Sequence, residues 1–136
     1  MPGLSDYSEL KTLDFLFGST QPATPGTWYL GLLITAGAET DIDPTAKEPT
    51  YGGYARLAIP NNTTRWSAAA SGTKANAGSL FFGTVTSGSG TLIGWCLCDA
   101  LTLGTVWVYG TLTTNKIVST GDVPQLATSD LQIMID

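Results

Sequence analysis

Histidine is absent from this chain of 136 residues. It is the commonest general base and metal ligand in proteins, and it is the usual partner of the nucleophile in Ser and Cys catalytic triads. No nucleophile with a histidine base can be assembled here. We therefore expect a protein that is not an enzyme and that holds no metal or other cofactor.

Charged residues are also scarce, since Lys, Arg, Asp and Glu make up 12% of the chain. Six basic residues against eleven acidic ones give a formal net charge of −5. No basic block is present to follow a phosphate backbone, so we expect no nucleic-acid partner. Apolar runs such as Trp28–Ile34 are far shorter than the roughly 20 residues that cross a bilayer. The first residues lack the basic and apolar regions of a secretory signal, so we expect no membrane partner and synthesis in a cytoplasm.

The two cysteines, Cys96 and Cys98, are too few for a disulfide framework or for a complete tetrahedral zinc site. On a strand both side chains would point to the same face, with their Cα atoms near the upper distance limit for a disulfide. We expect two small buried apolar side chains. A redox or metal-binding role is the alternative.

The first eighteen residues carry the pattern of an amphipathic helix. From Asp6 to Phe17 apolar residues recur at steps of three and four, Ser5 is a suitable N-cap, and Gly18 supplies a left-handed stop. The apolar positions are Tyr7, Leu10, Leu13, Leu16 and Phe17. This stripe must dock either on a sheet of its own chain or on a neighbouring subunit.

Beyond the helix, Thr, Ser, Gly and Pro separate short apolar runs, which is typical of an all-β domain. Hydrophobic residues make up 43% of the chain, enough for the core of one domain. We predict a mainly β, single-domain, jelly-roll-like β-sandwich over residues 19–136, preceded by a helical segment over residues 1–18. The expected strands lie within Trp28–Ile34, Tyr54–Ile59, Leu80–Phe82, Leu92–Cys98, Val106–Leu112 and Leu131–Ile135. The fourth and fifth should form the core pair, and Trp28–Ile34 should be a central strand.

The longest connection, Ala36 to Gly53, carries an acidic cluster formed by Glu39, Asp41, Asp43 and Glu48. Several carboxylates together suit a hard cation, but the spacing does not match an EF-hand loop. A solvated acidic loop is the favoured interpretation and cation binding the alternative. Outside this loop, Asp99 beside an expected core strand could belong to a glycosidase carboxylate pair, although capping the turn after Cys98 is the simpler role.

Three other side chains are candidates for recognition. Tyr51 and Trp66 lie next to expected turns, so we expect them to be exposed and available for binding, while most other aromatic residues fill the core. Arg56 alternates with apolar residues on an expected strand. We expect it to form a buried or interfacial salt bridge. The alternative is an exposed charge on an edge strand, where it would prevent unwanted strand pairing.

The order of several short motifs resembles small structural proteins of tailed bacteriophages, often labelled tail fibre proteins. The motifs begin with Leu4–Glu9, Leu13–Gly18 and Trp28–Leu32, and continue with Gly52–Arg56, Trp66, Asn76, Phe82, Gly94–Asp99, Gly110–Thr113 and Gly121–Pro124. The resemblance implies a virion protein with no catalytic residues. A long shaft repeat is missing, and a β-domain of this size is similar to capsid cement or decoration proteins, which are commonly trimers.

The resemblance therefore predicts a cement protein that binds the major capsid protein on the head exterior as an oligomer, with a trimer favoured, and stabilises the shell. The alternative is a tail fibre or tail-tip module that binds a host surface glycan; a lytic enzyme or a head-to-tail connector are further rivals. In each case the chain would be made in the host cytoplasm and end in the virion. The predicted interface residues are Leu10, Leu13, Phe17, Arg56, Asp41, Asp43, Tyr51 and Trp66.

Overall fold

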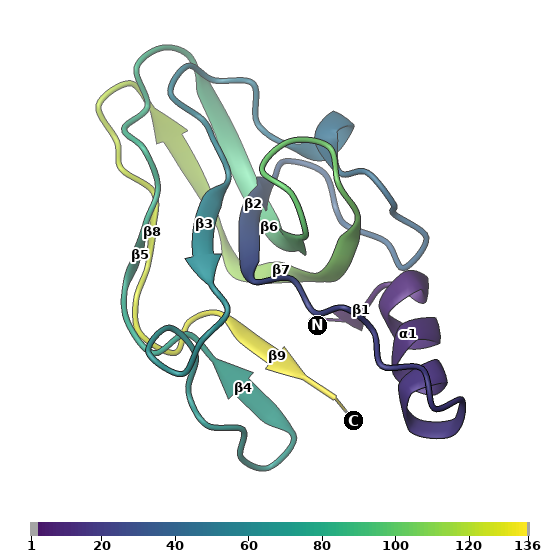
Figure 1. The fold of residues 1–136 in the computed structure, drawn as a ribbon. Coiled ribbons are helices and arrows are strands. Elements are labelled where there is room, and N and C mark those ends of the chain that lie inside the picture. The colour runs from purple at the N-terminus through teal and green to yellow at the C-terminus, as the bar shows by residue number, and fades with distance from the viewer. Residues whose placement is uncertain (1–2, 136) are drawn as a thin grey trace.

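A computed structural model describes residues 3–135 and confirms a mainly β fold with one N-terminal α-helix (Figure 1). The elements in chain order are β1 (Gly3–Leu4), α1 (Asp6–Phe17), β2 (Thr27–Leu33), the 3-10 helix η1 (Thr45–Lys47), β3 (Leu57–Pro60), β4 (Thr73–Ala75), β5 (Leu80–Phe81), β6 (Ser89–Cys98), β7 (Val106–Ser119), β8 (Gln125–Leu126) and β9 (Gln132–Met134). Within these residues no helix is long and apolar enough to cross a membrane.

Five strands form one antiparallel sheet in the order β1-β7-β6-β2-β3. The expected core pair is confirmed as the β6–β7 hairpin, although β7 continues past Leu112 to Ser119. Leu92 pairs with Lys116 and Gly94 with Thr111, so residues 112–115 lie opposite a single residue of β6. Such a bulge bends a strand and increases its twist, and β7 turns sharply in Figure 1.

Strand β2 is covered on both faces, as its uninterrupted apolar sequence predicts. It lies between β6 and β3. Leu30 and Leu32 face the main core, while Leu33 packs in a second cluster with Cys96 and Cys98. The neighbouring strand β3 begins at Leu57 rather than at the expected Tyr54.

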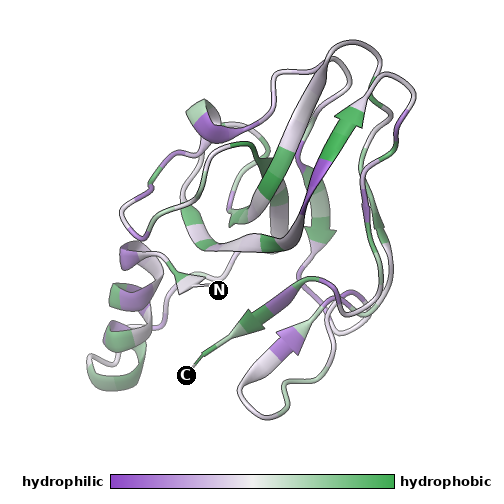
Figure 2. Ribbon diagram, turned by 180° about the vertical axis from the view of Figure 1, so that it is seen from behind, coloured by the Kyte–Doolittle hydropathy of each residue, from purple (hydrophilic) through white to green (hydrophobic). Residues whose placement is uncertain are grey.

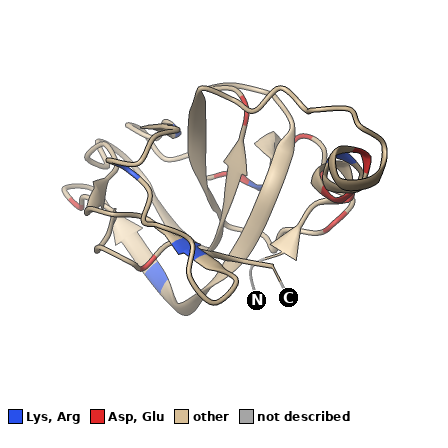
Figure 3. Ribbon diagram, turned by 60° about the horizontal axis from the view of Figure 1, so that its bottom comes forward, with Lys and Arg blue, Asp and Glu red and all other residues tan. Residues whose placement is uncertain are grey.

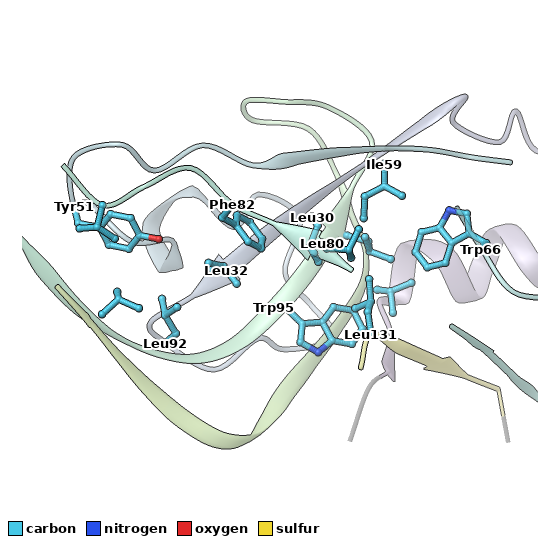
Figure 4. Packing of buried hydrophobic residues seen from close by; sticks show 14 residues of the cluster. Leu30, Leu32, Tyr51, Ile59, Trp66, Leu80, Phe82, Leu92, Trp95 and Leu131 are labelled. Carbon is cyan, nitrogen blue, oxygen red and sulfur yellow. The ribbon is translucent and has the colours of Figure 1, made fainter. Parts of the chain in front are cut away.

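Two short ladders, β4–β9 and β5–β8, lie outside the main sheet. Residues that precede or follow their strands, including Phe82 and Leu131, pack with the sheet residues Leu30 and Trp95 in the main core (Figure 4). The last strand, β9, is shorter than the predicted Leu131–Ile135. Of its apolar residues, Leu131 is buried and Ile135 is exposed.

Helix α1 begins and ends where the sequence predicts, with Ser5 as its N-cap. The expected left-handed stop at Gly18 is wrong, because Gly18 has φ −111° and the next residue, Ser19, has φ 55°. Glycine is still favoured at position 18. A Cβ there would lie 2.8 Å from the carbonyl oxygen of Asp14, to which the Gly18 N–H donates.

Candidate functional site

Helix α1 is fastened to the sheet by two small polar residues. The Ser5 hydroxyl donates to the carbonyl oxygen of Val106, and the Ser8 hydroxyl to that of Trp107, each at 2.6 Å. The Ser5 N–H donates to the same Trp107 oxygen at 3.0 Å. Both serines are buried, so the side of the helix that carries Ser8 is the side that faces its own domain.

The apolar side of α1 points away from the domain. With about 100° of rotation per residue, Leu10, Leu13 and Phe17 fall on one line along the helix, roughly opposite Ser8. Their side chains are 63%, 53% and 84% exposed, respectively. We call these three residues the apolar stripe. Figure 2 shows apolar residues gathered at the C-terminal end of α1.

Aromatic contacts complete the attachment of α1. The ring of Tyr7 packs edge to face on Trp107 at 5.1 Å between centroids, and Trp107 packs in the same way on Trp28 at 5.4 Å. The Trp107 indole N–H donates to Oδ2 of Asp99 at 3.2 Å, and the Thr105 N–H donates to Oδ1 at 2.7 Å. The capping role predicted for Asp99 is therefore confirmed.

Arg56 forms the buried salt bridge that was one of its two predicted roles. Its Nε and Nη2 donate to the two carboxylate oxygens of Glu48, each at 2.8 Å, and Nη1 donates to the carbonyl oxygens of Ala100 and Leu103. Arg56 is 6% exposed and Glu48 7% exposed. The guanidinium is used inside the chain, so Arg56 does not belong to a surface that a partner can reach.

Tyr54 completes this buried group. Its hydroxyl donates to Oε1 of Glu48 at 2.5 Å and accepts the N–H of Leu32 at 3.1 Å. Burial, and then the hydrogen bond to Glu48, raise the pKa of Tyr54 well above its usual value. Burial alone would lower the pKa of Arg56. The effects that raise this pKa, of which the hydrogen bond to Glu48 is the largest, outweigh burial, so the pKa of Arg56 is raised.

The acidic residues of the long connection do not converge. Asp41 pairs with Lys47 at 2.6 Å, whereas Asp43 accepts the hydroxyl and N–H of Thr45, which lowers its pKa, and Glu48 turns inward to Arg56. Within residues 3–135, no group of three or more His, Cys, Asp or Glu side chains could hold a metal ion. Asp41 and Asp43 remain predicted interface residues on this loop.

The predicted exposure of Tyr51 and Trp66 is wrong. They are 6% and 3% exposed and lie toward opposite ends of the main core (Figure 4). Tyr51 packs edge to face on Tyr54, and the chain on both sides of Trp66 folds back toward β4, with Trp66 bridged to Asn76. Both residues were expected at the surface because they lie next to turns in the sequence. The loops that carry them fold over the sheet, so their side chains are buried in the core.

The two thiols match the simpler interpretation of the cysteines. Both are free and buried on one face of β6, with 3.8 Å between their sulfur atoms. The hydrogen bond to Cys98, together with burial, raises the pKa of Cys96 far above its usual value. The thiol form is therefore stable, and a buried thiol of this kind is inert.

A groove of about 680 Å³ lies between the outer half of β7 and the segment around β8. Its floor includes the buried residues Leu92 and Trp95. Ile117 on β7 is 79% exposed and forms part of one lip, while Val123, 46% exposed, forms part of the other. We call this the β7–β8 groove. No local pattern in the sequence predicts this groove, because its lining comes from segments that are far apart along the chain.

A family model described as "Podophage GP4 fiber I protein gp80" matches residues 3–134. Among curated proteins, none matches the chain. The matched residues span every element from β1 to β9.

Proposed function

The chain belongs to the family of the podophage GP4 fiber I protein gp80, and from this membership we propose that it is a non-enzymatic structural module of a phage fibre. In this proposal it assembles with further copies of itself through helix α1. The description of the family as a fibre supports the tail-fibre alternative over the head-exterior cement role that the sequence also predicted.

One observation carries the self-assembly proposal, namely the outward direction of the apolar stripe. A surface helix normally turns its apolar face to the core, whereas the one buried residue of α1 is Ser8, and Leu10, Leu13 and Phe17 are exposed. Fully burying a Leu or Phe side chain is worth about 1.5–3 kcal/mol. A helix that leaves Leu10, Leu13 and Phe17 in water is therefore typical of a surface covered by another chain.

Two further features support a structural role without catalysis. The carboxylates of Glu48 and Asp99 are engaged in hydrogen bonds that hold loops to the sheet. Loop-holding hydrogen bonds of this kind are a structural role for both carboxylates. The scarcity of charge on the chain also suits surfaces buried between subunits, because interface cores are depleted of charged residues.

Sedimentation of the purified full chain tests the proposal. We expect the wild type to sediment as an oligomer, with three copies favoured, and the triple variant Leu10→Ser, Leu13→Ser, Phe17→Ser to sediment as a monomer. A matched control replaces three exposed apolar residues elsewhere, Phe81→Ser, Leu101→Ser and Ile135→Ser, and should keep the wild-type mass. Circular dichroism establishes that each variant is folded. A monomeric wild type, or a triple variant with unchanged mass, would overturn the proposal.

A further inference from the structure

We propose that an extended segment of a different protein of the particle binds in the β7–β8 groove as an added β-strand. This segment alternates apolar and polar side chains and carries a lysine or arginine. The inference rests on the proposed role in a phage fibre, but not on self-association through α1. It gives the chain a second contact, to an unlike partner.

The groove separates two strands that leave one tight turn without pairing with each other. The turn joins Ser119 to Asp122, where the Asp122 N–H donates to the carbonyl oxygen of Ser119 at 3.0 Å. On one side of the turn β7 pairs with β6, and on the other side β8 pairs with β5 (Figure 1). Strands joined by so short a turn commonly form a hairpin. Here both line a groove of about 680 Å³ instead.

The wall that contains β8 directs backbone groups into the groove. The carbonyl oxygens of Asp122 and Pro124 accept N–H groups from the chain around β5, at 2.8 and 2.9 Å. In an antiparallel ladder the alternate residues direct their N–H and C=O to the opposite edge. Those residues are Val123 and Gln125, and both line the groove. Pro124 has no N–H, but its position faces β5, so the groove edge loses no donor.

The opposite wall adds a donor and an acceptor at Ile117. The N–H of Ser119 donates to Oδ2 of Asp122 at 2.9 Å, and its C=O accepts the Asp122 N–H, so both groups point away from β6. The register of β7 on β6 is regular from Lys116 to Ser119, and alternation directs the N–H and C=O of Ile117 the same way. Within residues 3–135, β1 is the one strand paired to this edge of β7, and it reaches only Tyr109. Unpaired edge groups are a template for an added strand.

Side chains around the groove favour a polypeptide with alternating apolar residues. Val123 is exposed at one lip, and Leu112 and Leu126 are half-buried in the lining. An added strand places every second side chain on the same face, where these residues can cover it. The aromatic rings of the lining, Phe82 and Trp95, are only 6% and 4% exposed. They present no open face on which a sugar ring could stack, so the groove suits a peptide better than a host glycan.

Charge selects a basic segment and disfavours a second copy. Asp122 lies at one end of the β8 wall and Asp130, which bonds to Ala127, at the other, against one base in the lining, Lys116. Oδ2 of each acid accepts a backbone N–H at 2.9 Å, and within the described residues neither Oδ1 accepts a hydrogen bond. Each carboxylate is therefore held in place with one oxygen available to an ammonium or guanidinium group. A second copy brings a net charge of −5, and Figure 3 shows acidic residues on and beside its helix.

Photo-crosslinking in purified phage particles tests this inference. Val123 and, in a separate variant, Gln125 are replaced by p-benzoylphenylalanine; both are exposed. Leu101, exposed in the β6–β7 loop, is replaced in the same way as the control. We expect both groove variants to cross-link to one segment of another protein, with alternating apolar and polar residues and a lysine or arginine. Mass spectrometry identifies the segment, and the Leu101 variant should not capture it.

Amide hydrogen exchange then tests strand pairing itself. The captured segment is synthesised as a peptide and added to the purified chain. At a peptide concentration about ten times its Kd, exchange at Ile117, Val123 and Gln125 should slow about tenfold. A peptide N-methylated at alternate backbone positions should leave exchange unchanged. The double variant Asp122→Asn, Asp130→Asn keeps the accepting oxygens but should bind the basic peptide severalfold more weakly.

The outcomes separate this inference from the proposed function. Cross-links from Val123 to another copy of this chain or to carbohydrate would overturn strand addition by a different protein and leave the fibre role intact. Both groove variants present in the particle at the wild-type amount without a cross-link would overturn it too, as would unchanged exchange at Ile117 and Gln125 with the peptide bound. Absence of the wild-type chain from the particle would overturn the proposed function itself.

Discussion

Arg56 joins three segments that are far apart in sequence. Through Glu48 it holds the end of the long connection, and through the carbonyl oxygens of Ala100 and Leu103 it holds the β6–β7 loop. Each of the three guanidinium nitrogens donates to an acceptor, and such hydrogen bonds are what make a buried ion pair tolerable. These bonds position the loops at one end of the sheet.

Removing one partner of this pair should be costly. We expect Arg56→Met to lower the free energy of unfolding by about 3–5 kcal/mol, because Glu48 is left buried without its counter-charge. Urea denaturation at neutral pH measures the change. The double variant Arg56→Met, Glu48→Leu removes both charges and should recover part of the loss. A loss below about 1 kcal/mol in the single variant, the range of an exposed ion pair, would show that the pair is not buried in solution.

Tyr54 makes stability depend on pH in the alkaline range. Its pKa is raised in the folded chain, so above about pH 10, the usual tyrosine pKa, the unfolded chain releases a proton that the folded chain retains. Stability should therefore be intact below pH 10 and fall as the pH rises above it. In Tyr54→Phe the fall should be shallower, with a loss of about 1–3 kcal/mol at neutral pH from unpaired buried groups. Urea titrations from pH 7 to about 11 compare the two, and equal alkaline slopes would contradict the assignment.

At this scale the sequence predicted some partners and missed others. The need for a counter-charge at Arg56 follows from its place among apolar residues, and the capping role of Asp99 follows from its place after a strand. The burial of Tyr51 and Trp66 depends on loops that fold over the sheet. No local pattern encodes such a long-range arrangement.

Helix α1 shows what periodicity can and cannot predict at the scale of an element. Its bounds and its N-cap follow from the spacing of apolar residues and from Ser5. The side that faces the domain does not, because the apolar pattern fits docking on its own sheet and docking on a neighbouring subunit equally, and the buried contacts are made by Ser5 and Ser8. The sequence predicted Ser5 only as an N-cap, and it predicted no contact for Ser8.

The hydrogen bonds of Ser5 should determine how firmly α1 is held. We expect Ser5→Ala to lower the free energy of unfolding by about 0.5–2 kcal/mol, since it removes an N-cap and the donor to the carbonyl oxygen of Val106. Hydrogen exchange should become faster across α1 while β6 stays protected. Thr20→Ala, at an exposed position after the helix, serves as the control and should change neither. Unaltered exchange in Ser5→Ala would contradict the attachment described here.

The β6–β7 hairpin depends on a close approach at Gly110. A Cβ at this position would lie 2.5 Å from the Trp95 indole, whereas one at Gly78 would meet nothing within 4 Å. We expect Gly110→Ala to lower the free energy of unfolding by about 1–3 kcal/mol through overpacking, and Gly78→Ala to change it little. Thermal unfolding compares the two variants. Equal midpoints would mean that the indole does not pack over Gly110.

At the scale of the whole molecule, two unlike surfaces lie at opposite ends of one β domain. The outward stripe of α1 is one, and the β7–β8 groove is the other. The sequence predicted the first as an interface, because its residues recur at steps of three and four in one helix. It could not predict the second, because the groove combines β7, β8 and core residues that the fold alone brings together.

The copy number of this chain in purified phage particles tests the fibre account most directly. Quantitative mass spectrometry gives its amount relative to the major capsid protein. A fibre component should be present, at a small fraction of the copies of the major capsid protein, because the tail offers few attachment sites. Parity with the major capsid protein, as a head cement protein would show, or absence from the particle would contradict the account.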